Sequence, residues 1–311
     1  MGGVRWTPAT WWQDGCRIEV RRRSEAGLYS RLTWIPHSAR MIPSLPVLGS
    51  ALRLADLPQH LEWLCASARD LELTDPLTNV FFEGLWRSAA KQAAALLADH
   101  GGRRGAHAPF SSTPVDAADR RVVEVLRDRL RESLEFVALT GGSHLVLHSP
   151  FLYFGRGGSL HRGEAWAEQA LRVRDNLAPI VEEAAAQQCV LVIENIFDAR
   201  TEPLDALVRS LASPWVRRSL DTGHANLMRD RGAPPPDVWI ADAGEQLAHV
   251  HLADNDGESD RHWACGEGTI NWTSTFQALA RLHQPPRLIL EMSPARQHAS
   301  VAWLAQRGLA R

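Results

Sequence analysis

Short apolar segments alternate with longer amphipathic segments along most of the chain. From residue 41 onward, the apolar segments end near residues 74, 107, 148, 194, 221, 251 and 291. This spacing, roughly one strand plus one helix, is typical of a parallel sheet. With residues 42–52 as the first strand and 70–75 as the second, the pattern predicts eight strands and a closed α/β barrel, the (β/α)8 TIM barrel.

The segments between these strands carry helix signals. We expect helices over residues 86–100, 120–140 and 165–188, where Ala and Leu are frequent or apolar residues recur at a spacing of three and four. Asp116 and Asp119 are N-cap candidates for the second of these helices, and Gly141–Gly142 is a natural stop after it. A doubly wound open sheet is the alternative, but the glycine-rich phosphate loop that normally opens it is missing.

Residues 1–40 do not show this alternation of apolar and amphipathic segments. They contain several tryptophans and the basic run Arg21–Arg23 without a clear period, which indicates an extension outside the barrel repeat. The predicted domains are therefore an extension over residues 1–40 and a barrel over residues 41–311. Met41 as the natural start, and a basic patch for nucleic acid in the extension, stay open as alternatives.

Composition and charge narrow the class of protein. The 311 residues are 45% hydrophobic and 23% charged, with a net charge of −2, so no overall field draws the chain toward nucleic acid or an anionic membrane. No apolar run approaches the ~18 residues of a membrane span, and the N-terminus lacks the apolar core of a signal peptide. Four widely spaced cysteines without a CxxC pair are typical of reduced thiols. We expect a cytoplasmic protein.

Residues that often bind metals sit at the ends of the apolar segments. These are His107, His148, Glu194, Asp221, His224, His251, Asp260, His262 and Glu291. Because the carboxyl ends of parallel strands meet at one edge, these side chains are expected to converge there.

Glu194 gives the strongest signal of a metal site, because it directly follows the apolar run Val190–Ile193 and an unpaired carboxylate facing a barrel interior would be costly. Asp221 and His224 lie three residues apart at a predicted strand-to-loop turn. His249 and His251 share one strand face, and only His251 is expected to reach the barrel mouth, with His249 as a hydrogen-bonded core residue. Together with Glu291, the acids and imidazoles suit Mn²⁺, Mg²⁺, Co²⁺ or Zn²⁺.

At this point the chain resembles a known family. The motifs are HAPF (107–110), HSPF (148–151), ENI (194–196), DTGHA (221–225), HLADNDGESDRH (251–262), GEGTINW (266–272) and LEM (290–292). They are similar to those of the xylose-isomerase-like TIM barrel superfamily, over about residues 41–311. That superfamily contains sugar phosphate isomerases and epimerases and the type-IV apurinic endonucleases.

Within the isomerase and epimerase branch, the resemblance implies one divalent metal held by Glu194, Asp221, His251 and Glu291. The two glutamates would be catalytic, exchanging a proton at the carbon next to a carbonyl while the metal stabilises the enediolate. His224 would contact a substrate oxygen, and His107 and His148 are further candidates for substrate binding. Several ketose epimerases have an arginine about six residues after the metal histidine, where this chain has Gly257, so substrate recognition must differ.

Within the endonuclease branch, the resemblance implies up to three zinc ions. His107, His148 and Glu194 would hold the first. Glu194, Asp221, His251 and Glu291 would hold the second, and His224, Asp260 and His262 the third. The sequence differs from the motifs of the endonucleases after ENI and at HLADNDG. It also contains no evident basic or aromatic-rich loop for opening a DNA duplex.

Two further features lie at the predicted mouth. Trp263 and Trp272 are either a sugar-stacking wall or packing residues. The glycine-rich segment 151–164, with Arg156, His161 and Arg162, would form a lid that excludes water and meets a phosphate or carboxylate.

The favoured function is therefore a divalent-metal-dependent isomerase or epimerase of a sugar, sugar phosphate or related polyol. The alternatives are a multinuclear-zinc phosphodiesterase of the apurinic endonuclease kind and, third, a lyase, a dehydratase or a non-catalytic metal-binding barrel. The expected partner is a small carbohydrate, with nucleic acid disfavoured and no membrane, and a homo-oligomer stays open.

Overall fold

The computed structural model describes residues 12–13, 16–17, 45–111, 113–151 and 163–311. Leu45–Arg311 forms one compact unit. In the unit Met1–Ser44, the described residues form two short antiparallel strands, β1 (Trp12–Gln13) and β2 (Cys16–Arg17). The predicted boundary at residue 40 stays a prediction.

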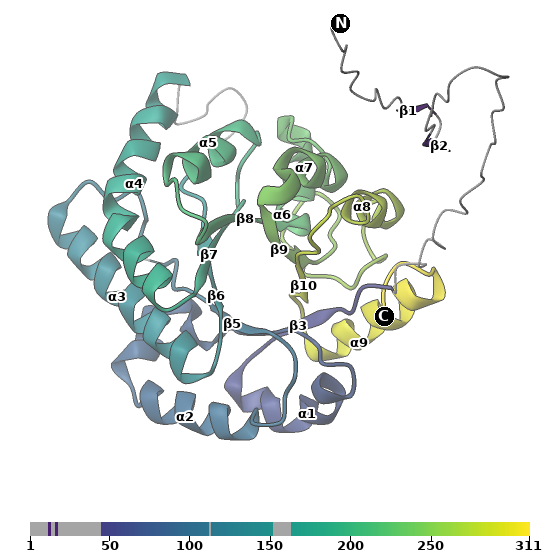
Figure 1. Cartoon of the computed structure of the whole chain (residues 1–311), viewed down its shortest axis with the longest axis horizontal. Helices are drawn as coiled ribbons and strands as arrows, with labels where there is room; N and C mark the ends of the chain where they lie inside the picture. Colours follow the sequence, from purple (N-terminus) through teal and green to yellow (C-terminus); the bar gives the residue numbers. More distant parts are fainter. Residues whose placement is uncertain (1–11, 14–15, 18–44, 112, 152–162) are drawn as a thin grey trace, which may run out of the picture. The chain divides into compact units, whose positions relative to one another are not determined.

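Eight parallel strands close into a barrel, in the order β10-β3-β4-β5-β6-β7-β8-β9 (Figure 1). The strands are β3 (Gly49–Leu52), β4 (Leu71–Leu73), β5 (Arg104–His107), β6 (His144–His148), β7 (Val190–Glu194), β8 (Val216–Asp221), β9 (Leu247–Leu252) and β10 (Arg287–Leu290). The TIM barrel prediction is confirmed, and the open sheet is excluded because β10 pairs with β3.

Helices surround the strands in Figure 1. They are α1 (Leu57–Ala66), α2 (Trp86–Leu96), α3 (Arg120–Leu139), α4 (Gly163–Ala186), α5 (Glu202–Ser210), α6 (Thr222–Leu227), α7 (Pro236–Ala243), α8 (Trp272–Leu279) and α9 (Pro294–Gln306). Short 3-10 helices occupy Leu54–Asp56, Asp75–Leu77, Asn79–Glu83, Arg229–Arg231 and Gly244–Gln246. The three predicted helices are present as α2, α3 and α4, each with slightly different ends.

The ends of α3 follow the sequence signals closely. The Asp119 side chain caps the helix by accepting a hydrogen bond from Arg121 N at 2.8 Å. Gly141 adopts a φ of 70°, which a side chain would disfavour, directly after the helix. Asp119, rather than Asp116, is therefore the N-cap.

The first strand is shorter than predicted. The prediction covered residues 42–52, but β3 begins at Gly49. The preceding residues pair with the C-terminus instead, since Leu48 N donates to Arg311 O and Arg311 N donates to Pro46 O, both at 2.9 Å. A proline lacks the N–H that a central strand needs, so Pro46 favours this arrangement.

The apolar core lies between the strands and the helices. In α3, Leu126, Leu130 and Leu134 recur every four residues and are almost fully buried. The barrel interior also holds polar side chains, Glu72, His144 and His249 among them, each with no exposed surface. Polar groups at such depth need hydrogen-bond or charge partners.

None of the helices in the described part of the chain is both long enough and apolar enough to cross a membrane. Cys65, Cys189 and Cys265 are free cysteines.

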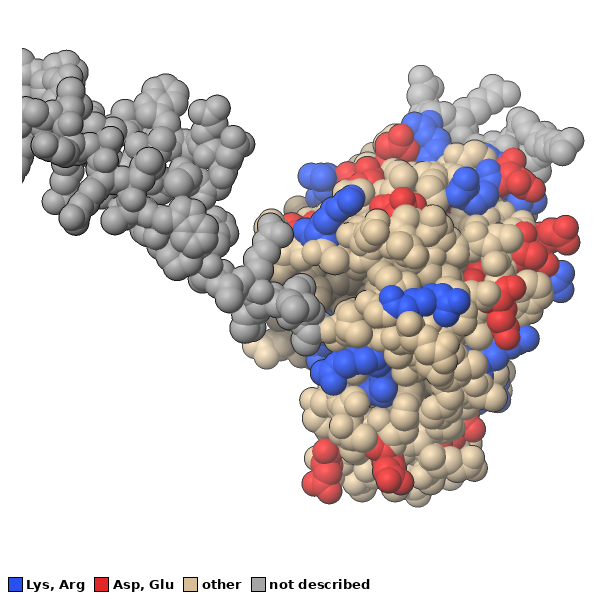
Figure 2. Space-filling view, turned by 90° about the vertical axis from the view of Figure 1, so that its right-hand side faces the viewer, with Lys and Arg blue, Asp and Glu red and all other residues tan. Residues whose placement is uncertain are grey.

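On the face that Figure 2 shows, basic and acidic side chains are scattered among the other residues. This face therefore has no broad stripe of one sign of the kind that follows a nucleic-acid backbone.

Candidate metal centre

The predicted residues converge at one end of the barrel because their strands end there. His107, His148, Glu194 and Asp221 are the last residues of β5, β6, β7 and β8. His251 is the next-to-last residue of β9, and Glu291 follows β10 directly. The strand register sets His148 beside Glu194 and Asp221 beside His251.

Four of these residues form a compact set of donors. One donor atom from each of Glu194, Asp221, His251 and Glu291 lies within 4.8 Å of the others. His251 Nδ1 is 3.0 Å from Glu194 Oε2 and 3.3 Å from Glu291 Oε2. Glu194, Asp221 and His251 are buried, while the Glu291 side chain is 18% exposed, so the set opens on the Glu291 side.

A second set shares Glu194. His107, His148 and Glu194 also offer donor atoms within 4.8 Å of one another. The two Nε2 atoms of the histidines are 3.2 Å apart, and His107 Nε2 is 3.8 Å from Glu194 Oε2. Burial, followed by the charge of His107, lowers the pKa of His148 to about 3, so its imidazole is neutral, as metal ligation requires.

In the third predicted set, Asp260 lies close to each of the two histidines. Asp260 Oδ2 lies 3.4 Å from His224 Nε2 and 3.0 Å from His262 Nε2. His262 has a φ of 45°, a conformation that non-glycine residues rarely adopt and that is often found at functional sites. The Nδ1–H of His262 donates to Glu291 O at 2.6 Å, which turns Nε2 toward Asp260.

Several buried polar atoms at the mouth lack hydrogen-bond partners. These are both carboxylate oxygens of Glu194, Oδ2 of Asp221 and Nδ1 of His251. Buried polar atoms are nearly always paired, so these atoms fit a cation lying between them. The described residues are therefore positioned to hold a metal ion, and the role of each as a ligand stays a prediction.

The charges of the metal-free site point the same way. Burial would raise the pKa of Glu194, but the charge of His251 and the nearby imidazole of His224 outweigh it and hold that pKa well below its usual value. Burial would lower the pKa of His251, but the nearby carboxylates of Glu291, Glu72 and Glu194 hold it well above its usual value. The carboxylates thus stabilise a positive charge at this position.

Backbone and side-chain partners fix which nitrogen each histidine presents. His107 Nδ1–H donates to Ala108 O at 2.8 Å, which leaves Nε2 facing His148 and Glu194. His251 Nε2–H donates to Glu72 Oε1 at 2.8 Å, which leaves Nδ1 facing Glu194 and Glu291. Metal-binding histidines typically have such a second partner.

The turn after β8 is a short helix, where the sequence predicted a loop. Asp221 caps α6 by accepting a hydrogen bond from His224 N at 2.6 Å, so one carboxylate oxygen is used by the backbone. Asn195 joins the ends of β7 and β8 by accepting from Asp221 N at 2.9 Å and donating to Asp221 O at 3.2 Å. His224 Nδ1 contacts Asn195 O at 3.1 Å, so the helix start and the asparagine together place His224.

The GEGTINW segment is held by a single buried acid. Asp254 accepts hydrogen bonds from Gly266 N, Ile270 N and the Trp272 indole, at 2.9, 3.2 and 2.8 Å. Trp272 is only 2% exposed, so it is a packing residue and the reading as a sugar-stacking wall is wrong for it. Trp263 is half-buried and pairs through its backbone with Asp254.

The sequence reading missed two residues, Glu72 and His144. Glu72 contacts His251, His249 and His144, and the prediction of His249 as a buried, hydrogen-bonded histidine holds, since its Nδ1 lies 2.8 Å from Ser219 Oγ. An acid between two leucines in a three-residue strand was the available signal, because alternation turns Glu72 toward the barrel interior. Residues 152–162 of the predicted lid, with Arg156, His161 and Arg162, lie outside the described residues.

The chain is similar to known proteins in sequence and in fold. The sequence model of the xylose isomerase-like TIM barrel family matches residues 69–307. The uncharacterized protein MJ1311 of Methanocaldococcus jannaschii is 27% identical over 187 residues, 57% of this chain and 59% of that protein. The chain thus spans less than two thirds of this relative's length.

Two solved structures show the same fold. The TTHB071 protein from Thermus thermophilus, soaked with ZnCl₂, is 25% identical with a TM-score of 0.66, covering 85% of this chain and 99% of that one. A D-tagatose 3-epimerase-like protein is 20% identical with a TM-score of 0.67, covering 83% of this chain and 96% of that one.

Proposed function

The chain belongs to the xylose isomerase-like TIM barrel family, and we propose that it is a divalent-metal-dependent isomerase or epimerase of a sugar, a sugar phosphate or a related polyol. The observation that carries the proposal is the pair Glu194 and Glu291. Their carboxylates come from different strands and both approach His251 Nδ1, at 3.0 and 3.3 Å. Two acids around one cation position suit proton transfer on a bound substrate.

Two solved structures with a similar fold have names that refer to sugar epimerases, and this supports carbohydrate as the substrate class. One is the D-tagatose 3-epimerase-like protein, and another is 3-keto-D-glucoside 4-epimerase YcjR from E. coli, with a TM-score of 0.65 at 16% identity. At this identity the likeness concerns the fold. Carbohydrate as the substrate class is part of the proposal.

Glu194, Asp221, His251 and Glu291 would hold the ion. The mixed oxygen and nitrogen donors suit Mn²⁺, Co²⁺, Zn²⁺ or Mg²⁺. When bound, such an ion supplies Lewis-acid polarisation of substrate oxygens.

The residues of the chain would perform the proton transfer. Glu194 and Glu291 would remove and return the proton at the carbon beside a carbonyl, through an enediolate. His224 would donate to a substrate oxygen, since its Nε2 faces Asp260 at the open side of the site. His107 and His148 would bind the substrate on the other side of Glu194, where Phe110 stacks on His148 with ring centroids 4.4 Å apart. Phe110 is 47% exposed, and an exposed aromatic ring suits the C–H face of a sugar.

A second candidate function is a multinuclear-zinc phosphodiesterase. It is favoured by the further donor set His107–His148–Glu194 and by the contacts of Asp260 with His224 and His262, at 3.4 and 3.0 Å. Neighbouring metal ions can stabilise both the attacking and the leaving oxygen of a phosphodiester.

The two functions are separated by activity and by metal count. We expect a panel of ketoses and their phosphates to show interconversion when the apoprotein is loaded with Mn²⁺ or Co²⁺, with one ion needed at the mouth. Nicking of an abasic-site oligonucleotide, three ions clustered at the mouth and no sugar interconversion would instead establish the phosphodiesterase. The wild-type protein without added metal is the control in both assays.

A further inference from the structure

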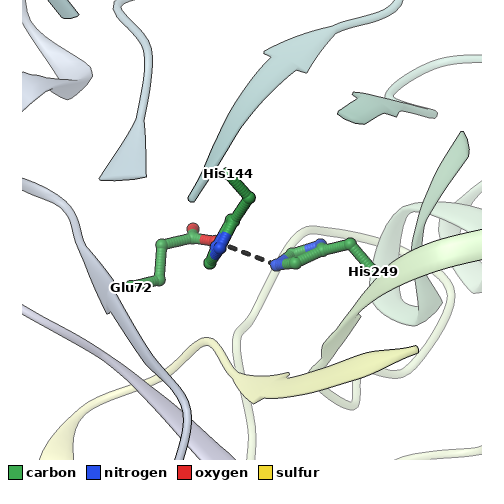
Figure 3. Close-up of side chains that lie close together, drawn as sticks. All are labelled: Glu72, His144 and His249. Atoms are coloured by element: carbon green, nitrogen blue, oxygen red, sulfur yellow. Dashed lines mark hydrogen bonds and ion pairs between the residues drawn. The ribbon is translucent and has the colours of Figure 1, made fainter. Parts of the chain in front are cut away.

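A second group of metal-type side chains lies inside the barrel, apart from the nine residues that the sequence predicted as ligands. Glu72 comes from β4, His144 from the start of β6 and His249 from β9, and Figure 3 shows the three side chains pointing toward one another. None has exposed surface, and their donor atoms lie within 4.8 Å of one another. The three residues are called the inner triad below.

Both imidazoles turn the same nitrogen toward one carboxylate oxygen. His249 Nε2 is 2.9 Å and His144 Nε2 is 3.3 Å from Glu72 Oε2. Donors around a tetrahedral Zn²⁺ at about 2.0–2.1 Å lie about 3.3 Å apart. The spacing in the inner triad is therefore close to that of ligands sharing one ion.

Hydrogen bonds alone do not account for the inner triad. His249 Nε2 is buried and makes no hydrogen bond among the described residues, although Glu72 Oε2 is only 2.9 Å away. Its other nitrogen, Nδ1, is held by Ser219 Oγ at 2.8 Å. His251 at the mouth shows the same combination. Its Nε2 is held by Glu72, while its Nδ1 is buried and has no hydrogen-bond partner among the described residues.

The rings are held rigidly in place. A Cβ atom at Gly105 would meet the ring of His144 at 2.2–2.4 Å, so only glycine allows the imidazole to lie against this backbone. Rigid donors lose little conformational entropy on binding an ion.

Glu72 brings a buried carboxylate into the inner triad, and its oxygens lie within 3.3 Å of the imidazoles of His144, His249 and His251. A buried carboxylate is costly without a positive charge nearby, and a cation held by the inner triad would supply one.

From this geometry we propose that Glu72, His144 and His249 bind a divalent cation of the Zn²⁺ or Co²⁺ class inside the barrel, separate from the mouth. Two imidazoles and one carboxylate are a common donor set for such ions. Glu72 Oε1 remains free to accept the N–H of His251, so the inner ion would stabilise the orientation of His251. The proposal goes beyond the proposed function and does not depend on it.

Metal counting on folded variants tests the proposal. Apoprotein is reloaded with ZnCl₂, desalted and analysed for zinc per chain, with circular dichroism as the check on folding. We expect His144→Asn and His249→Asn each to bind one ion fewer than wild type. His283→Asn, a change at an exposed histidine away from both sites, is the matched control and should bind the wild-type number. An equal zinc content in all four proteins would overturn the proposal.

A measurement on the wild-type protein covers the case in which the variants do not fold. Crystals soaked in ZnCl₂ should give an anomalous peak at the zinc edge within about 2.0–2.2 Å of Glu72, His144 and His249 donor atoms. A map with no peak there overturns the inner site, whatever it shows elsewhere. A map with the inner peak and an empty mouth would support the inner site and contradict the proposed function.

Discussion

Glu194 is the residue on which the candidate site depends most, because it belongs to both the central donor set and the His107–His148 set. Glu194→Gln keeps the shape but removes the charge. We expect the affinity for Co²⁺ to fall by more than the roughly 10–100-fold typical of losing an outer partner of a metal ligand. Calorimetric titration of the apoprotein measures the change.

Glu258→Gln is the matched control for Glu194→Gln. Glu258 is an exposed glutamate on the loop after β9, so its change should leave the affinity at the wild-type value. If Glu194→Gln bound Co²⁺ as tightly as Glu258→Gln, the assignment of the mouth as a metal site would be wrong.

Asp198 gives a pH dependence that can be measured without any ligand. Burial raises its pKa to about 7, although hydrogen bonds from Ile196 N and Ser149 Oγ lower it in part. Because the folded pKa is above the unfolded value of about 3.9, the stabilising contribution is complete below that value and is lost as the pH rises through about 7.

We therefore compare wild type with Asp198→Asn, which stays neutral. Between pH 5 and 8 the free energy of unfolding of wild type should fall relative to the variant, by up to about 1.4 kcal/mol per pH unit. Urea unfolding at several pH values provides the measurement. If the free energy of unfolding of the two proteins changed with pH in the same way, the pKa of Asp198 would not be raised in the folded protein.

At the residue level, the sequence revealed the acids and histidines that directly end strands, because the apolar runs before them are long enough to recognise. Glu72 was not predicted because β4 has only three residues, which are too few to show the alternation of inward and outward side chains clearly. His144 escaped because it begins a strand, and its partner Glu72 is 72 positions away in the chain. Such pairing depends on the closure of the barrel, which local patterns do not encode.

At the scale of elements, helix ends with a polar cap or a glycine were predicted well, as α3 shows, whereas the first strand was not. Residues 45–48 are apolar enough to resemble a strand, but they pair with Arg311 at the opposite end of the chain. A contact between the two ends of the barrel unit leaves no local signal in the sequence. The helical start after Asp221 was also missed, because α6 has only six residues.

The loop that contains the GEGTINW motif can be tested through one of its glycines. A Cβ atom at Gly268 would lie 2.2 Å from Asn255 O and 2.3 Å from Asp254 Oδ1. Gly268→Ala must therefore displace Asp254, the buried acid that holds the loop. We expect the free energy of unfolding to fall by roughly 1–3 kcal/mol, as measured by urea unfolding.

Gly84→Ala is the matched control, since its Cβ would meet nothing closer than 3.7 Å and its φ of −104° is open to alanine. Its stability should change by no more than about 0.5 kcal/mol. Equal stabilities of the two variants would mean that Asp254 does not fix this loop as described.

At the scale of the whole molecule, the barrel brings three acids and a histidine from four strands to one mouth. The mutual repulsion of the acids must be offset by a cation or by protons. A bound metal should therefore stabilise the fold, by about 2.7 kcal/mol at a free concentration 100 times the Kd. We expect the Tm to fall after chelation with EDTA and to recover on addition of Mn²⁺ or Co²⁺. A Tm indifferent to both treatments would contradict a metal site in the folded protein.

The most direct test of the proposed chemistry is solvent deuterium exchange. The metal-loaded protein is incubated in D₂O with a panel of ketoses, aldoses and their phosphates, and the sugars are analysed by NMR and mass spectrometry. Our account predicts one deuterium at the carbon beside the carbonyl of at least one sugar, lost in Glu194→Gln and in Glu291→Gln. Sugars that stay unlabelled throughout the panel, while an abasic-site oligonucleotide is cleaved, would contradict it.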